Sequence, residues 1–295
     1  MAPDRRRSLP AVIAAAGVLA LAGGCGQGGA APGEEPTGVG SNLPRADEPA
    51  DLDPADFTTE IDNPYWPLAA GTGWVYRETN EAGEELRVVV TVTSATKVTA
   101  AGVTARVVRD TVTLDGRVIE DTFDWYAQDS EGTVWYLGED TAEFEDGEVV
   151  SREGSFEAGV DGALAGVIMP ADPSPGMAYR QEYFEGEAED NGEVVSCDEQ
   201  VDVPAGHYDD VLLTKDTITI EPGVLEYKLY ARGVGLVLAL GISGGGGREE
   251  LLEVESVSAD VAAAAGSTPL GESYDLPCGA TGGRPFDRAA SVRLR

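Results

Sequence analysis

The chain has 295 residues, of which 53 are acidic and 20 basic, and its formal net charge is −33. A protein this acidic repels nucleic-acid phosphates and has no cluster of Lys and Arg to displace their counterions. It is also repelled by anionic lipid headgroups. We therefore expect no nucleic-acid partner and no membrane binding through surface charge.

The N-terminus has the features of an export signal. Arg5, Arg6 and Arg7 precede an apolar stretch of 13 residues, Leu9 to Leu21, which is too short to span a bilayer because about 20 residues are needed. This pattern predicts a signal peptide over residues 1–24. The following Leu-Ala-Gly-Gly-Cys25 resembles a lipobox, so Cys25 is the predicted lipid attachment site. The alternative is a plain secretory peptide that leaves Cys25 as an ordinary thiol.

Residues 25–57 are rich in Gly, Ala, Pro, Glu and Asp. Such a segment buries too little apolar surface to offset the entropy of ordering it, so we predict a disordered tether. Without Asp4 and the three signal arginines, the mature chain has 52 acidic and 17 basic residues and a net charge of −35. The predicted location is the outer face of the cytoplasmic membrane, lipid-anchored and facing the cell wall.

Between residues 58 and 258 polar and apolar residues alternate along short segments. Glu120, Thr122 and Asp124 alternate with Phe123, Trp125 and Ala127, and Glu226 and Lys228 alternate with their apolar neighbours. A period of two predicts antiparallel strands with one solvated and one buried face, and hence an all-β domain. Four dipeptides predict turns between strands: Asp115-Gly116, Glu131-Gly132, Asp146-Gly147 and Asn191-Gly192.

The domain contains an internal repeat, with copy one at about 64–138 and copy two at about 167–241. Residues recur in the same order: Pro67, Gly73, Tyr76, Arg77, Tyr126 and Gly138 match Pro170, Gly176, Tyr179, Arg180, Tyr230 and Gly241. A duplicated meander of about five strands per copy must cover its apolar face. We therefore predict either a two-sheet sandwich or one curved, barrel-like sheet, followed by an irregular tail over 259–295.

The repeat separates fold residues from candidate site residues. Arg77 with Asp110, and Arg180 with Asp216, are predicted to form equivalent ion pairs, which we interpret as structural. Trp74, Trp125 and Trp135 align with Met or Leu in the second copy, which favours core positions over a ligand-stacking platform. Tyr65 and Trp66, before the first long strand, are expected to be exposed and are the candidate ligand contacts.

The sequence lacks the residues that most catalytic mechanisms require. The single histidine, His207, is expected in an exposed turn, and no nucleophile elbow, zinc ligand set or phosphate-binding loop occurs. We predict no catalytic residue and no cofactor. Asp124, Asp129 and Glu131 could supply oxygens to calcium, but a solvated acidic turn is the favoured interpretation. The paired carboxylates of a glycosidase leave no signature in sequence spacing.

Two cysteines follow Cys25. We predict that Cys197 and Cys278 form a disulfide, since an exposed free thiol is a liability in an oxidising compartment. The bridge would close a loop of about 80 residues and contribute about 4 kcal/mol in the chain-entropy model. The alternative is two unrelated thiols, one buried and one exposed.

The run Asn63 to Leu68, with Trp74 to Arg77, Phe123 to Gly138 and Tyr230 to Val237, resembles an uncharacterised family of bacterial exported proteins and lipoproteins. The resemblance implies no activity, substrate or catalytic residue; the departure from it at Cys197 supports the predicted bridge. Two hypotheses remain. The first is a non-enzymatic binding or carrier module for an apolar ligand or a cell-envelope partner. The second is an extracytoplasmic hydrolase that uses carboxylates.

Overall fold

The computed structural model describes residues 43–245, 247–274 and 291–293. Cys25, Cys278, the predicted signal peptide and most of the predicted tether lie outside these residues. Within them, no helix has the length and apolar character to cross a membrane. Every strand pair is antiparallel, which confirms the all-β prediction.

The elements have the following bounds. A 3-10 helix, η1, spans Pro54–Asp56. The strands are β1 (Phe57–Thr58), β2 (Thr72–Thr79), β3 (Glu85–Val98), β4 (Thr104–Leu114), β5 (Arg117–Asp129), β6 (Val134–Glu145), β7 (Glu148–Ser151), β8 (Phe156–Glu157), β9 (Gly166–Met169), β10 (Ala178–Arg180), β11 (Asp190–Val203), β12 (Gly206–Ile218), β13 (Leu225–Ala231), β14 (Gly235–Ser243), β15 (Arg248–Ser256) and β16 (Ser291–Arg293). One α-helix, α1, spans Ala259–Ala265.

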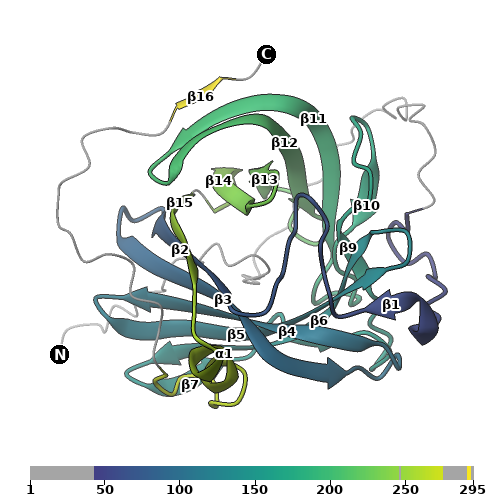
Figure 1. Ribbon diagram of the computed structural model, residues 1–295, viewed down its shortest axis with the longest axis horizontal. Coiled ribbons are helices and arrows are strands. Elements are labelled where there is room, and N and C mark those ends of the chain that lie inside the picture. Colours follow the sequence, from purple (N-terminus) through teal and green to yellow (C-terminus); the bar gives the residue numbers. More distant parts are fainter. Residues whose placement is uncertain (1–42, 246, 275–290, 294–295) are drawn as a thin grey trace, which may run out of the picture.

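The strands form one large sheet in the order β10-β11-β12-β13-β14-β15-β2-β3-β4-β5-β6-β7. The strands on either side of the β15–β2 junction are joined in chain order, as in a meander. The sheet bends so that β2 to β6 form a floor and β11 and β12 arch over it (Figure 1). It is curved and is not closed into a barrel, so of the two predicted architectures the curved sheet is the one observed.

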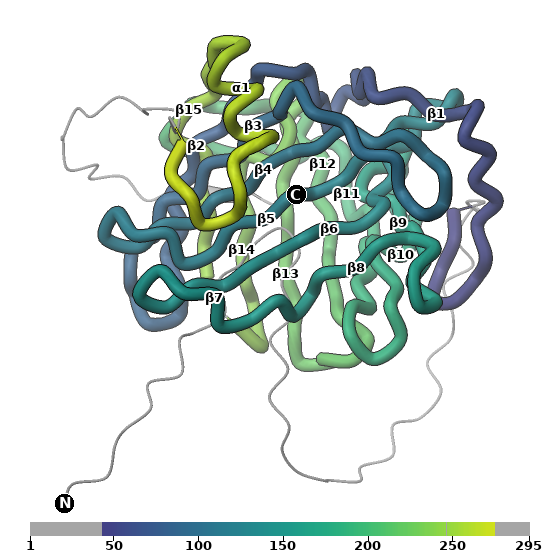
Figure 2. Tube along the Cα trace, turned by 90° about the horizontal axis from the view of Figure 1, so that it is seen from below, coloured from purple at the N-terminus to yellow at the C-terminus, as the bar shows by residue number. Residues whose placement is uncertain are grey.

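Residues matched between the two halves of the sequence lie on corresponding strands. Tyr76 lies on β2 and Tyr179 on β10, while Tyr126 lies on β5 and Tyr230 on β13. Figure 2 shows β4 to β6 crossing in front of β12 to β14 at a steep angle. The curved sheet therefore covers the inner face of one half with the inner face of the other.

The three tryptophans are core residues, as predicted. Trp74, Trp125 and Trp135 are 4%, 7% and 8% exposed. Two of their indole N–H groups find acceptors: that of Trp74 donates to the carbonyl of Val234 at 2.7 Å, and that of Trp135 to Asp129 Oδ2 at 2.8 Å. The rings of Trp74 and Trp135 are thus buried, and their N–H groups have acceptors inside the fold.

Three of the four predicted turns are confirmed. Asp115-Gly116 and Asp146-Gly147 have positive φ at both residues and close the β4–β5 and β6–β7 hairpins, and Gly132 lies between β5 and β6. The turn at Asn191-Gly192 was a wrong prediction, because both residues pair within β11. A Cβ at Gly192 would lie 2.7 Å from the ring of Tyr179. This glycine gives an aromatic ring room to lie against the strand.

The predicted irregular tail begins with helix α1. Its alanine-rich sequence favours helix, and the Ser258 hydroxyl accepts from the amide of Val261 as the N-cap. The helix and the residues after it are held to the convex face of the sheet by Arg109, which is fully buried. Arg109 bonds both oxygens of Asp121 and donates to three tail carbonyls, those of Ala265, Thr268 and Pro269.

The predicted tether is ordered from Leu43 onward. A second buried arginine, Arg180 at the sheet edge, holds this segment: its Nη1 donates to the carbonyls of Ala46, at 2.8 Å, and Glu48. The amide of Arg180 donates to the carbonyl of Pro44 at 2.9 Å. Leu43, Ala50 and Leu52 also pack against the core. These hydrogen bonds and apolar contacts hold a segment whose composition alone predicts disorder.

Substituting Arg109 by Met should destabilise the domain by about 3–5 kcal/mol, since it leaves Asp121 buried without its charged partner. Urea unfolding measures the loss, and limited proteolysis should cut the chain first near α1. Arg152→Met is the matched control, because the Arg152–Asp140 pair is half exposed and is worth less than about 1 kcal/mol. Equal losses in the two variants would contradict this account of the tail.

Candidate functional site

The polar faces of the central strands point inward, contrary to the prediction of a solvated face. Glu120, Thr122 and Asp124 are 8%, 4% and 8% exposed, and Lys228 is 9% exposed. Sequence alternation distinguishes two faces of a strand but does not identify which one meets solvent. Here the curvature of the sheet encloses the acidic face, while Arg109 and α1 cover the other.

The strand register collects these side chains on one continuous concave face. Residues directly opposite one another in a ladder share a face; examples are Asp110 with Thr122, Asp124 with Glu139, and Asp216 with Glu226. The carboxyl-bearing residues placed there are Glu78, Asp110, Glu120, Asp124, Glu139, Asp190, Asp216, Glu226 and Glu249. The enclosed surface is therefore acidic over many strands.

Asp124 and Glu139 meet at a tyrosine. The Tyr136 hydroxyl lies 2.7 Å from Asp124 Oδ1 and 2.8 Å from Glu139 Oε2. A phenol has one hydrogen to donate, so one carboxyl group accepts it and the other must donate a proton of its own. Burial raises the pKa of Asp124 to about 7, against the opposing hydrogen bond from Tyr136. At neutral pH the three groups therefore hold two protons, one on the phenol and one on a carboxyl group.

The two halves of the sheet bring further acids to this point. Burial raises the pKa of Glu139 well above its ordinary value, and the charge of Glu182, from just beyond β10, adds to the shift. The pKa of Glu182 is itself raised by burial and then by Asp190 and Asp124. Glu182, from the second half of the chain, thus acts electrostatically on Glu139 of the first half.

Lys228 is the lysine of the concave face. Its Nζ lies 3.0 Å from Asp216 and 3.4 Å from Glu226. Burial alone lowers the pKa of Lys228, but the two carboxylates outweigh it and raise that pKa well above its ordinary value. The single positive charge of Lys228 is taken up by acids of the second half, leaving those of the first half uncompensated.

Three acids of the concave face, Asp110, Glu139 and Asp190, have an oxygen without a hydrogen-bond partner. Asp190 lies in the second half, where the charge of Lys228 acts on it, so the two that lack a nearby cation are Asp110 and Glu139. Asp110 Oδ1 and Glu139 Oε1 are buried and accept no hydrogen bond, and the two residues are 8% and 2% exposed. Burial raises the pKa of Asp110 well above its ordinary value, followed by the charges of Asp124, Asp121 and Glu78. Each unpaired buried oxygen costs about 1–3 kcal/mol, a cost that a donor placed beside it would remove.

Aromatic rings continue the concave face beside these acids. Tyr126 stacks on Tyr136 with ring centroids 4.8 Å apart, and Trp66 lies 5.8 Å from Tyr126 and 5.7 Å from Tyr230. Trp66 is half-buried. Tyr65, which we expected to be exposed, is 2% exposed, because its backbone is tied into the turn by Asn63 and Arg232 lies over its ring.

Two other predictions about polar residues fail. Arg77 pairs with Glu250 at 2.8 Å and not with Asp110, and Asp216 pairs with Lys228 and not with Arg180. Sequence position in the repeat identified the strands, but the β15–β2 junction, which has no counterpart in the second half, supplies the partner of Arg77. His207 is half exposed, as expected, but it lies at the start of β12 and not in the turn itself. It pairs with Asp202 of β11, and its Nδ1 lies 2.9 Å from Asp202 Oδ1.

The calcium ligand set considered from the sequence is not assembled. Asp129 accepts bonds from its own turn and from Trp135, while Asp124 faces Tyr136. Among the described residues no group of three or more His, Cys, Asp or Glu side chains is placed to hold a metal ion. Cys197 is half-buried with Sγ 3.5 Å from the carbonyl of Pro173, and its predicted partner Cys278 lies outside the described residues.

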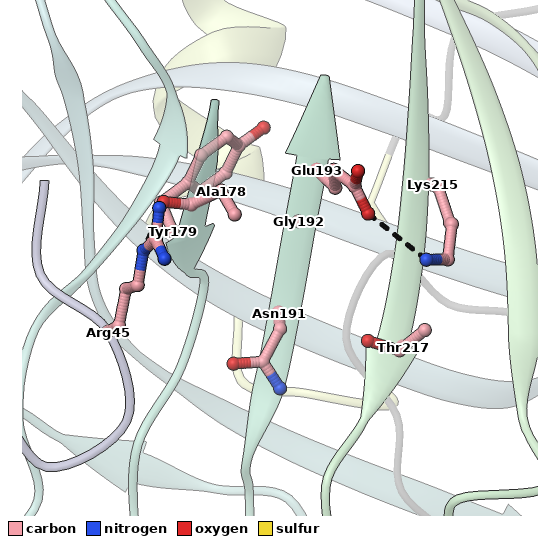
Figure 3. A pocket seen from close by; sticks show the side chains of 8 residues that line it. All are labelled: Arg45, Ala178, Tyr179, Asn191, Gly192, Glu193, Lys215 and Thr217. Carbon is pink, nitrogen blue, oxygen red and sulfur yellow. Dashed lines mark hydrogen bonds and ion pairs between the residues drawn. The ribbon is translucent and has the colours of Figure 1, made fainter. Parts of the chain in front are cut away.

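A separate small pocket lies on the convex face at the β10–β11 edge (Figure 3). Its volume is about 140 Å³, and an ion pair of 3.0 Å between Lys215 and Glu193 crosses it. Ligand pockets usually enclose about 300–1,000 Å³. The convex pocket is too small for most ligands. The concave face is the candidate site because it holds the buried, unpartnered oxygens of Asp110 and Glu139.

Comparisons with known proteins leave the chain without an assigned family. No protein-family model and no curated protein matches it. A solved structure described as a putative lipoprotein from Parabacteroides distasonis is similar, with 10% sequence identity and a TM-score of 0.36. The match covers 65% of this chain and 98% of that one.

The stability of the domain should fall as the pH rises from about 4 to about 7. The folded chain retains protons on Asp124 and Asp190, whose pKa values are raised by burial to about 7, whereas the unfolded chain releases them near pH 4. The slope is about 1.4 kcal/mol per pH unit for each proton released. Urea unfolding at several pH values measures it.

Asp124→Asn should flatten this slope, while Glu148→Gln, at an exposed position on β7, should leave it unchanged. A stability that rises between pH 5 and pH 7, or an unaltered slope in Asp124→Asn, would show that these acids are ionised in the folded protein.

Proposed function

We propose that the chain is an extracytoplasmic lipoprotein whose curved sheet is a binding module, with the ligand held on the concave face. The observation that carries the proposal is the pair of buried, unpartnered carboxyl oxygens on Asp110 and Glu139. A core built only for stability would place apolar groups there, since buried polar groups without partners are destabilising. Costly groups of this kind are typical of functional sites.

The membrane attachment is proposed from the sequence. The Cys25 motif would place a lipid at the mature N-terminus, and the acidic domain would gain its membrane residence from that lipid alone. The segment 26–42 would then separate the anchor from Leu43, where the chain joins the domain. In this arrangement the domain works close to the outer face of the cytoplasmic membrane.

Cys25→Ser should release the protein from the membrane fraction. In cells fed a radiolabelled or alkyne-tagged palmitate, the wild-type chain should carry the label and partition into the detergent phase of Triton X-114, and the variant should do neither. Ser41→Ala, in the segment that follows Cys25, is the control and should change neither the label nor the partitioning. Retention of label by Cys25→Ser would place the lipid elsewhere.

The binding module is tested by native mass spectrometry of the mature chain purified from its own membrane. We expect a bound species of defined mass that is lost in Asp110→Asn and retained in Glu148→Gln. Recovery of only the bare chain under several growth and purification conditions would contradict a binding role.

A hydrolase that uses carboxylates is the second candidate. Its supporting observation is the pair of acids joined through Tyr136, one of which must carry a proton while the other does not. Unequal protonation suits a general acid and a base. Both acids are more than nine-tenths buried, however, and the hydrolase requires a route by which substrate and water reach them. A binding module needs a route for its ligand as well, but it needs no catalytic water at the acids. It is the function favoured by the unpartnered oxygens of Asp110 and Glu139.

A further inference from the structure

We propose that the concave face binds a linear organic polyamine, with one ammonium group at Asp110 and a second at Glu139. This inference rests on the proposed binding function and adds the chemical class of the ligand. It replaces the apolar ligand expected from the sequence, because the enclosed surface carries carboxyl groups where an apolar ligand needs hydrocarbon contacts.

The sign of the ligand follows from the charges that face the two acids. Glu78, Glu120 and Asp124 act on Asp110, and Glu182 and Asp124 act on Glu139. The nearest buried cation of the concave face, Lys228, is already held by two carboxylates of the second half. A cationic donor would satisfy the free oxygens and offset the like-charge repulsion at once, which a neutral or anionic ligand cannot do.

The spacing of the acids favours several separated ammonium groups over one metal ion. Calcium needs six or more oxygens around a single point, whereas no three acidic side chains in the described residues gather in that way. Asp110 on β4 and Glu139 on β6 are separated by two strand spacings and by an offset of two residues along the strands, which together amount to about 12 Å. A polyamine of three or four nitrogens spans this distance.

The neighbouring rings suit the same ligand. The stacked Tyr126 and Tyr136 lie beside Asp124, and Trp66 continues this aromatic surface toward Tyr230. Ring faces attract cations, and their edges pack against the methylene segments between ammonium groups. The acids of the concave face thus border an aromatic surface, which suits a ligand with both ammonium groups and methylene segments.

The test is calorimetric titration of spermidine into the mature lipidated chain in detergent at physiological salt, where weak binding to surface carboxylates is screened. We expect one spermidine per chain and an affinity at least about tenfold lower in Asp110→Asn and in Glu139→Gln. Glu148→Gln, which removes one exposed carboxylate and keeps the concave face, should bind as the wild type does. Spermidine should also raise the melting temperature of the wild type, a readout that needs no variant.

Several results would overturn the inference. Spermidine binding of equal affinity in wild type and both concave-face variants would mean general attraction to an acidic surface. Calcium binding at one site with the same dependence on Asp110 and Glu139 would make the ligand a metal ion. A neutral or anionic species that co-purifies and depends on Asp110 would retain the binding module and reject the polyamine. Absence of any co-purifying species, together with no spermidine response, would reject both.

Discussion

More carboxyl groups are enclosed by the curved sheet than its cations can balance, and this constraint governs the rest of the structure. Acids packed at close range in a medium of low dielectric cannot all be ionised together. Two arrangements reduce the negative charge. Asp124, Tyr136 and Glu139 are joined by hydrogen bonds that need a proton on one of the acids, and Lys228 lies between Asp216 and Glu226. What remains unbalanced, at Asp110 and the free oxygen of Glu139, is the site we assign to a ligand.

Buried charges on the outer face of the same sheet have different surroundings. There the arginine of the first half has partners on every side: Arg109 is bonded to both oxygens of Asp121 and to three carbonyls of the tail. The Asp121 carboxylate also accepts from Thr111 and from the amide of Gly271. The two faces of β5 thus place acids in different surroundings within a few residues of each other: Asp121 lies among hydrogen-bond donors, and Asp124 lies beside Glu139 and the hydroxyl of Tyr136.

Sequence patterns predicted the elements better than their surroundings. Alternation around Glu120 to Ala127 correctly indicated strands, because a period of two is a property of the backbone. It gave the wrong environment for the polar residues, since which face is enclosed depends on the curvature of strands far away in the chain. The same limit explains Gly192, whose role depends on the ring of Tyr179, and Arg77, whose partner Glu250 lies 173 residues away. One signal could have helped: the inward positions carry acids with almost no cations among them.

The contact between Arg180 and the segment that contains Ala46 and Glu48 has a mechanical consequence. A lipid-anchored domain is pulled by its N-terminal end whenever the cell wall and the membrane move apart. Such a load would enter the fold at β10, the edge strand, and would reach Arg180 before any central strand. Because the Nε of Arg180 also donates to the carbonyl of Ala165, just before β9, the force would be divided between the two margins of the sheet. If the chain is anchored through Cys25 as proposed, Arg180 would take part of the tension on the anchor before it reaches the hydrogen bonds of the edge strand.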